Sequence, residues 1–156
     1  MSSQPLVSQI IPVYVRDEEN IHYFGEGLES ILAQTYENIE ILIVNDGSPL
    51  TKELEAFLQP YESRIRYIKK ENGGVATALN KGIEEMKGDY FSWLSHDDWF
   101  YPTKIATQIE QIQKEDGNTI LYCDVEHVDN KLEHLSFEYV PDLDRKTYRW
   151  IASMSR

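Results

Sequence analysis

Apolar residues fall into short runs along the chain, and the runs follow two different spacings. Continuous apolar runs are typical of strands buried on both faces of a sheet, and they predict strands at residues 6–14, 39–44, 65–68, 90–94 and 119–123. Between them, apolar positions three or four residues apart predict helices. The helical sets are Ile21, Phe24, Leu28, Ile31 and Leu32; Leu54, Phe57 and Leu58; Val75, Leu79, Ile83 and Met86; and Ile105, Ile109 and Ile112.

The regular alternation of strand and helix predicts an α/β fold with a doubly wound, mainly parallel sheet and helices on both faces. Asn20 is placed to cap the first helix, and Pro102 to begin the fourth, where its missing N–H costs no hydrogen bond. Residues 145–154 predict at most a terminal helix. Because ligands of such sheets bind at the carboxyl ends of the strands, the turns that follow the strands are the candidate site.

Size and composition set the broad class. The chain has 156 residues, 41% of them hydrophobic, which predicts one compact domain over residues 1–156. Cys123 is the single cysteine, so no intrachain disulfide can form, and a reducing compartment is expected. No run approaches the roughly 20 apolar residues of a membrane helix, and the first residues lack the pattern of a signal peptide. These features predict a cytoplasmic location.

The formal net charge of −12 limits the partners of the chain. Proteins that bind DNA or RNA present basic surfaces, so the charge argues against a nucleic-acid partner. A phosphate ligand would also be repelled unless something neutralised it. A divalent metal held by carboxylates would serve that purpose.

Two adjacent carboxylates, Asp97 and Asp98, follow the strand predicted at 90–94. Neighbouring acids repel each other, and a cation between them removes the repulsion. Mg²⁺ or Mn²⁺ suits this pair, because hard cations take oxygen ligands and Mg²⁺ often uses one or two carboxylates together with substrate phosphates. The alternative is an ordinary acidic turn before the helix at Pro102. His96, just before the pair, is placed to contact phosphate, although a lone histidine is more often structural.

Three further segments follow predicted strands. Asp46 ends the second strand, where it could hold a base or ribose, and Gly47 would let the backbone turn sharply; the alternative is a plain Asn-Asp-Gly turn in which Asp46 bonds its own backbone. The segment 71–82 brings paired glycines and the amides of Asn72 and Asn80, with Lys81 as a nearby cation, or it is simply a loop. After the first strand come Tyr14, which could stack on a base, and the acids 17–19, whose alternative is a solvated charge run.

Taken in order, the segments PVYVRDEEN, IEILIVNDGSP and ENGGVATALNKGIEEMKGDYFSWLSHDDWFYP resemble the family 2 glycosyltransferases, which have the GT-A fold. The segment LAQTY at 32–36 is similar to a helix end of that family. The likeness runs from about Val7 to Cys123. Each motif alone is weak, but their order and their places at strand ends are specific.

The resemblance implies a site for a nucleoside-diphosphate sugar, with a UDP-sugar expected. Its substrate-binding residues would be Pro12, Tyr14, Glu19, Asp46, Asn72, Gly74, Asn80 and Asp97, with Gly82 nearby. Asp46 matches the residue that contacts the base in the family. Asp97 and Asp98 match the DXD-type motif, in which the first carboxylate meets the ribose and the second meets a Mn²⁺ or Mg²⁺ ion that bridges the diphosphate.

The implied reaction is inverting transfer of the sugar to a saccharide or lipid-linked acceptor during synthesis of cell-surface polysaccharide. The catalytic base of the family lies well downstream, and Asp124 and Glu126 match it poorly, so we expect the base and the acceptor half beyond Arg156. Peripheral association with the inner face of the membrane is expected, and apolar surface left by a missing half would favour a homo-oligomer. A non-catalytic nucleotide-sugar-binding or assembly module of the same fold is the alternative.

A different enzyme class on a doubly wound sheet, such as a dinucleotide-dependent oxidoreductase or a sugar nucleotidyltransferase, is disfavoured. The turn after the first strand carries no glycine-rich sequence that would admit a pyrophosphate.

Overall fold

The computed structural model describes residues 4–115, 119–129 and 133–139. The chain divides into two compact units, Met1–Gln111 and Ile112–Arg156, which are described separately. The helix expected at 145–154 lies outside the described residues. The expectation that residues 1–156 form a single donor-binding domain stays a prediction.

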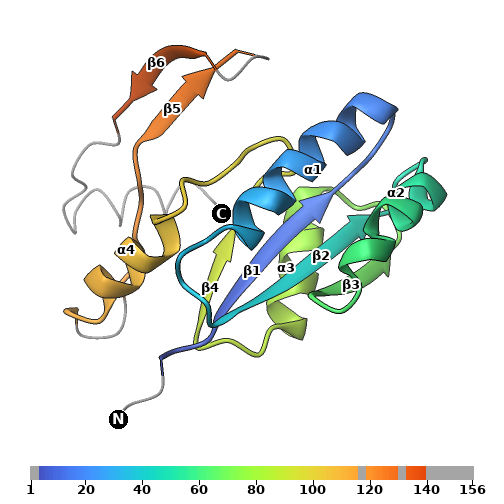
Figure 1. The fold of residues 1–156 in the computed structure, drawn as a ribbon. Helices are drawn as coiled ribbons and strands as arrows, with labels where there is room; N and C mark the ends of the chain where they lie inside the picture. Colours follow the sequence, from blue (N-terminus) through green and yellow to red (C-terminus); the bar gives the residue numbers. More distant parts are fainter. Residues whose placement is uncertain (1–3, 116–118, 130–132, 140–156) are drawn as a thin grey trace, which may run out of the picture. The chain divides into compact units, whose positions relative to one another are not determined.

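The first unit is built on a four-stranded parallel sheet in the order β3-β2-β1-β4 (Figure 1). The strands are β1 (Val7–Val13), β2 (Ile39–Asp46), β3 (Ile65–Lys70) and β4 (Tyr90–Trp93). The helices are α1 (Glu18–Leu32), α2 (Thr51–Leu58), α3 (Val75–Glu85) and α4 (Lys104–Ile112), with a short 3₁₀ turn at Gln59–Tyr61. Four of the five predicted strands and all four predicted helices of this region are therefore confirmed.

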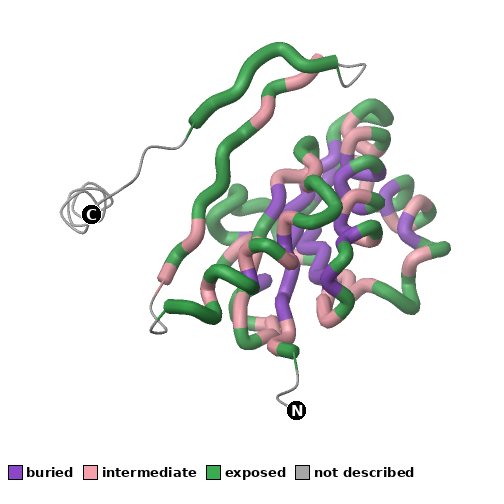
Figure 2. Tube along the Cα trace, turned by 60° about the vertical axis from the view of Figure 1, so that its left-hand side comes forward, coloured by how far each residue is buried: buried purple, intermediate pink, exposed green. Residues whose placement is uncertain are grey.

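Alternate residues of the central strands pack against helices on opposite faces of the sheet. Ile11 and Ile43 lie in a core cluster with side chains of α1 and α2, such as Phe24 and Leu54. Ile10, next to Ile11 on β1, and Leu42, next to Ile43 on β2, join the cluster on the α3 side. Figure 2 shows buried positions concentrated along these strands and on the helices that cover them. Among the described residues, no helix has the length and apolar character needed to cross a membrane.

Helix α3 packs on the sheet through two small residues and Leu79, which is partly buried against the core. Ala78 and Gly82 are its buried positions, and a Cβ atom on Gly82 would lie 2.5 Å from a methyl carbon of Ile10. Val75 is 57% exposed and Ile83 41% exposed. The predicted apolar stripe of this helix therefore marks its buried face only in part, because Leu79 packs against the core and Val75 and Ile83 do not. The helix approaches the strand so closely that only a residue without a side chain fits at Gly82.

The start of α1 also differs from the prediction. Asp17, not Asn20, is the N-cap residue, and its side chain accepts a hydrogen bond from the backbone N–H of Asn20 at 2.9 Å. The Asn20 side chain instead accepts from Arg16 N at 3.2 Å. Both residue types cap helices well, so the sequence did not distinguish two candidates three positions apart.

The strand predicted at residues 119–123 is wrong, because residues 119–124 form no strand. The second unit instead contains an antiparallel pair, β5 (Val125–Val128) and β6 (His134–Glu138). None of its described residues is buried. An apolar run forms a buried strand only where a neighbouring strand pairs with it. In this unit the pairing of β5 with β6 begins at Val125.

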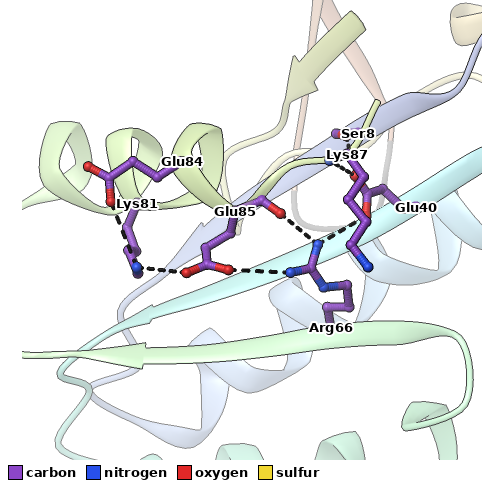
Figure 3. Close-up of polar contacts among 7 residues, drawn as sticks. All are labelled: Ser8, Glu40, Arg66, Lys81, Glu84, Glu85 and Lys87. Atoms are coloured by element: carbon purple, nitrogen blue, oxygen red, sulfur yellow. Dashed lines mark hydrogen bonds and ion pairs between the residues drawn. The ribbon is translucent and has the colours of Figure 1, made fainter. Parts of the chain in front are cut away.

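A polar network ties α3 and the turn after it to the amino ends of the strands (Figure 3). Glu40 on β2 accepts hydrogen bonds from Ser8 Oγ and Lys87 N, and pairs with Arg66 at 3.1 Å. Arg66 also donates to the backbone oxygen of Glu85 at 2.7 Å. Burial alone would raise the pKa of the Glu40 carboxyl, but these hydrogen bonds together hold it below its ordinary value of 4.5.

We expect Glu40→Gln to lower the free energy of unfolding by about 1–3 kcal/mol at pH 7, because the charged hydrogen bonds to a largely buried carboxylate are lost. The lowered pKa means that the contribution of Glu40 is present above pH 4.5 and is lost as the pH falls through the folded pKa. Urea unfolding at pH 7 and near pH 3 should show the difference between wild type and variant shrinking in acid. Glu84→Gln is the control, since Glu84 is 70% exposed and lies 3.7 Å from Lys81. A difference equal at both pH values would contradict this role for the charge.

Candidate functional site

Parallel pairing brings the ends of four strands to one edge of the sheet. Val13 of β1 is level with Asn45 of β2, and Asp46 is level with Lys70 of β3. The strand β4 runs parallel to β1 on its other side. The segments that begin at residues 14, 47, 71 and 94 therefore all leave the sheet at this edge, which confirms the predicted arrangement of the turns.

Asp46 lies at the centre of this edge and is only 3% exposed. Its carboxylate accepts from the backbone N–H of Gly74 at 2.7 Å and from that of Gly73 at 3.1 Å. Lys70 Nζ lies 2.5 Å from its Oδ1, and Asn72 Nδ2 donates to its backbone oxygen at 2.9 Å. Asp46 is thus joined to the loop after β3. The role in base contact that the resemblance implies for Asp46 stays a prediction.

The turn after Asp46 depends on glycine, as the sequence indicated. Gly47 has φ of +68°, which side chains disfavour, and a Cβ atom there would lie 2.7 Å from Asn72 N. Gly74, with φ of +88°, is the N-cap residue of α3. The two segments therefore stack backbone against backbone, and Asn72 itself remains exposed.

The paired acids lie on the loop that follows β4. Leu94 is buried and donates its N–H to Ile10 O, which fixes the start of the loop. Asp97 and Asp98 are exposed, and Asp98 N donates to Ser95 O at 3.3 Å in a turn. Among the described residues no three acids, histidines or cysteines are grouped as a metal site. Two exposed carboxylates nevertheless fit Mg²⁺ or Mn²⁺, because such ions take the remaining ligands from phosphates and water.

Helix α1 anchors this acidic loop, a role that the sequence did not reveal. A Cβ atom on Gly27 would lie 2.7 Å from the backbone oxygen of Asp98, so helix and loop are in direct contact. Ser30 Oγ accepts from Phe100 N at 3.0 Å. The side chain of Gln34 donates to Tyr101 O at 2.9 Å and accepts from Ile105 N at 3.1 Å. Two sequence features pointed to this contact: the LAQTY segment, which contains Gln34, and Gly27 within the helix.

The other predicted binding residues lie in three settings. Pro12 is buried in β1, and Tyr14 is partly buried, with the Arg16 guanidinium 5.9 Å from its ring centre. Glu19 is exposed on α1 and accepts from Tyr23 Oη at 2.9 Å, which raises the pKa of the Tyr23 hydroxyl. Asn80 is exposed within α3, and no hydrogen bond joins it to the other predicted site residues that the structure describes.

The cation beside Asp46 is Lys70, not the predicted Lys81. Lys81 pairs with Glu85 at 2.8 Å on the surface of α3. Lys70 ends β3 beside Asp46. The sequence did not single it out, because two adjacent lysines are typical of an exposed strand end. In the second unit, Glu126 lies 2.7 Å from His134 Nδ1 across the hairpin.

The part of the chain that contains the candidate site also matches known proteins. The model of glycosyl transferase family 2 matches residues 8–151. The chain belongs to glycosyl transferase family 2. An uncharacterized glycosyltransferase of Rickettsia felis is 52% identical over 134 residues, which are 85% of this chain and 22% of that protein. The minor teichoic acid biosynthesis protein GgaB of Bacillus subtilis is 41% identical over 96 residues, 58% of this chain and 10% of that protein.

Solved structures of glycosyltransferases share the fold, which is GT-A. Staphylococcus aureus TarS 1–349 in complex with UDP matches with a TM-score of 0.61 and 19% identity, over 70% of this chain and 32% of that one. The mannosyltransferase PcManGT from Pyrobaculum calidifontis, in complex with GDP-Man and Mn²⁺, matches with a TM-score of 0.60 and 19% identity over the same shares. The family 2 sequence described here therefore spans a minor part of the proteins that it resembles.

A matched pair of glycine substitutions tests the contact between α1 and the acidic loop. Gly27→Ala should displace the loop, since the added methyl group meets a backbone oxygen, and should lower stability by about 1–3 kcal/mol. Gly25→Ala meets the edge of the Phe57 ring at 3.0 Å, which can shift, and serves as the control. Amide chemical shifts should move at residues 95–100 in Gly27→Ala only. Unchanged shifts there, with full stability, would contradict the contact.

Proposed function

We propose that this family 2 chain is the donor-binding part of a metal-dependent glycosyltransferase. It binds a nucleoside-diphosphate sugar, a UDP-sugar above others, through Mn²⁺ or Mg²⁺. The reaction is inverting transfer to a saccharide or lipid-linked acceptor in cell-surface polysaccharide synthesis, at the inner face of the membrane. The observation that carries the proposal is the pair Asp97 and Asp98, exposed at the same edge of the sheet as Asp46 and the glycine loop.

Electrostatics supports the use of a metal. The chain carries a formal charge of −12, and the cation beside Asp46 is already paired with it. Lys70 is therefore not available to neutralise a diphosphate at this edge, and a divalent ion on exposed carboxylates would supply positive charge beside that of the exposed Arg16. When bound, such an ion acts as a Lewis acid that stabilises charge on the diphosphate leaving group.

In this proposal the residues of the site have separate roles in holding the metal and the nucleoside. Asp98 would hold the metal with Asp97, and Asp97 would also meet the ribose. Tyr14 and the loop of Asn72 and Gly74 would border the nucleoside. Gly27 and Ser30 of α1 hold the loop at Asp98 and Phe100, so the two carboxylates would need little rearrangement when the donor binds. Their placement before binding is the main contribution of this chain to catalysis.

The relatives give independent support for the ligand class. TarS has been solved with UDP and PcManGT with GDP-Man and Mn²⁺, and both share this fold. GgaB is named for teichoic acid synthesis, which is consistent with a cell-surface polymer as product. The donor site of the proposal lies within the part of the chain that matches the family.

Calorimetry tests the metal role directly. UDP should bind at least about tenfold more tightly with Mn²⁺ than with chelator, a difference of about 1.4 kcal/mol. Asp98→Asn should remove that difference, because the metal loses a charged ligand. Glu62→Gln is the control, since Glu62 is an exposed acid before β3, at the opposite edge of the sheet. Equal affinity with and without chelator would contradict the proposal.

Thermal unfolding gives a second test that needs no enzymatic activity. With Mn²⁺ present, UDP at about 100 times its dissociation constant should add about 2.7 kcal/mol of stability, because it binds the folded state only. The melting temperature should rise accordingly, and less in Asp98→Asn. A melting temperature unmoved by UDP, GDP and other nucleoside diphosphates would rule out the donor site.

A further inference from the structure

Asp46 is the one buried acid among the residues that the structure describes. Its side chain is 5% exposed, and that of its partner Lys70 is 20% exposed. A carboxylate removed from water in this way needs both a counter-charge and hydrogen bonds. Lys70 supplies the charge, and the backbone of Gly73 and Gly74 supplies hydrogen bonds.

The ammonium of Lys70 can donate three hydrogen bonds, and all three are made within the protein. They go to Asp46 Oδ1, to the backbone oxygen of Glu71 at 2.6 Å, and to Thr77 Oγ1 at 2.8 Å. One side chain thus joins the end of β2, the loop that follows β3, and the first turn of α3. It also means that Lys70 has no donor left for a phosphate group.

The loop depends on these bonds because, apart from Asn72, which donates to Asp46 O at 2.9 Å, its own residues provide little else. Gly73 and Gly74 have no side chains to pack, and ordering glycine costs more conformational entropy than ordering other residues. Gly74 offers no side-chain cap to α3. A Cβ atom on Gly73 would lie 3.2 Å from Lys70 Nζ and 2.8 Å from Thr77 Oγ1, so the loop closes around the ammonium group.

We propose that Lys70 is a positioning residue of the donor site. It holds Asp46 and the 71–74 loop in the shape that receives the nucleoside, and it does not itself contact the diphosphate. This inference rests on the proposed function, because it assigns a role within that donor site. A substitution of Lys70 should therefore weaken binding by the same factor whether the nucleoside carries no phosphate, one phosphate or two.

The experiment compares uridine, UMP and UDP as ligands, with Mn²⁺ present, by NMR titration for the weak ligands and calorimetry for the strong one. Lys70→Met should weaken binding of all three by a similar factor, about tenfold or more. A lysine that bound phosphate would give a different result, with a large loss for UDP and none for uridine. Lys69→Met is the control, because Lys69 is an exposed neighbour that pairs with Glu55 at 2.9 Å.

Two further variants keep the test decisive if Lys70→Met folds poorly. Thr77→Val removes one acceptor of Lys70 while leaving the charge pair with Asp46, and should weaken the three ligands by a smaller common factor. Lys70→Arg keeps the charge and should recover part of the affinity lost in Lys70→Met.

Three outcomes would overturn the inference. One is affinity for all three ligands unchanged in Lys70→Met and Thr77→Val, and another is a loss confined to UDP. In both cases wild-type binding of UDP would leave the proposed function standing. The third is a wild-type chain that binds no uridine nucleotide, which would overturn the proposed function together with the inference.

Discussion

The parallel direction of the four strands is the constraint on which the site depends. Parallel pairing requires each strand to return by a crossover, and it places every carboxyl end at the same edge of the sheet. Residues separated by half of the chain, such as Tyr14, Asp46 and Asp98, therefore leave the sheet at one edge. The hydrogen bonds of the central strands are shielded by helices on both faces, so this arrangement is set by the buried core and not by the ligand.

Close approach of backbones is the second constraint, and glycine makes it possible at three places. Gly82 lets α3 approach Ile10, Gly27 lets α1 contact the acidic loop, and Gly47 lets the turn after β2 lie against Asn72. Two of these three contacts shape the candidate site. The site is thus formed by main chain held at short distance, with a few side chains, such as Gln34 and Lys70, fixing the loops in place.

The sequence predicted the parts of the fold that depend on local pattern. Continuous apolar runs located β1 to β4, and strand ends located Asp46 and Asp97 as candidate site residues. It failed where the outcome depends on a partner. Residues 119–124 have the composition of a strand but form none, and the fully buried positions of α3 are Ala78 and Gly82 instead of its larger apolar residues. Lys70 could not be predicted, because its role depends on three groups that come together only in the folded chain.

The central claim is that the two acids after β4 hold a metal together with a donor diphosphate, and a crystal structure with Mn²⁺ and UDP tests it most directly. The account predicts an anomalous manganese peak about 2 Å from a carboxylate oxygen of Asp98, with diphosphate oxygens completing the coordination. The uridine should lie beside Tyr14 and Asn72. A structure in which Asp97 and Asp98 face bulk water, while manganese and nucleotide bind elsewhere, would contradict the account.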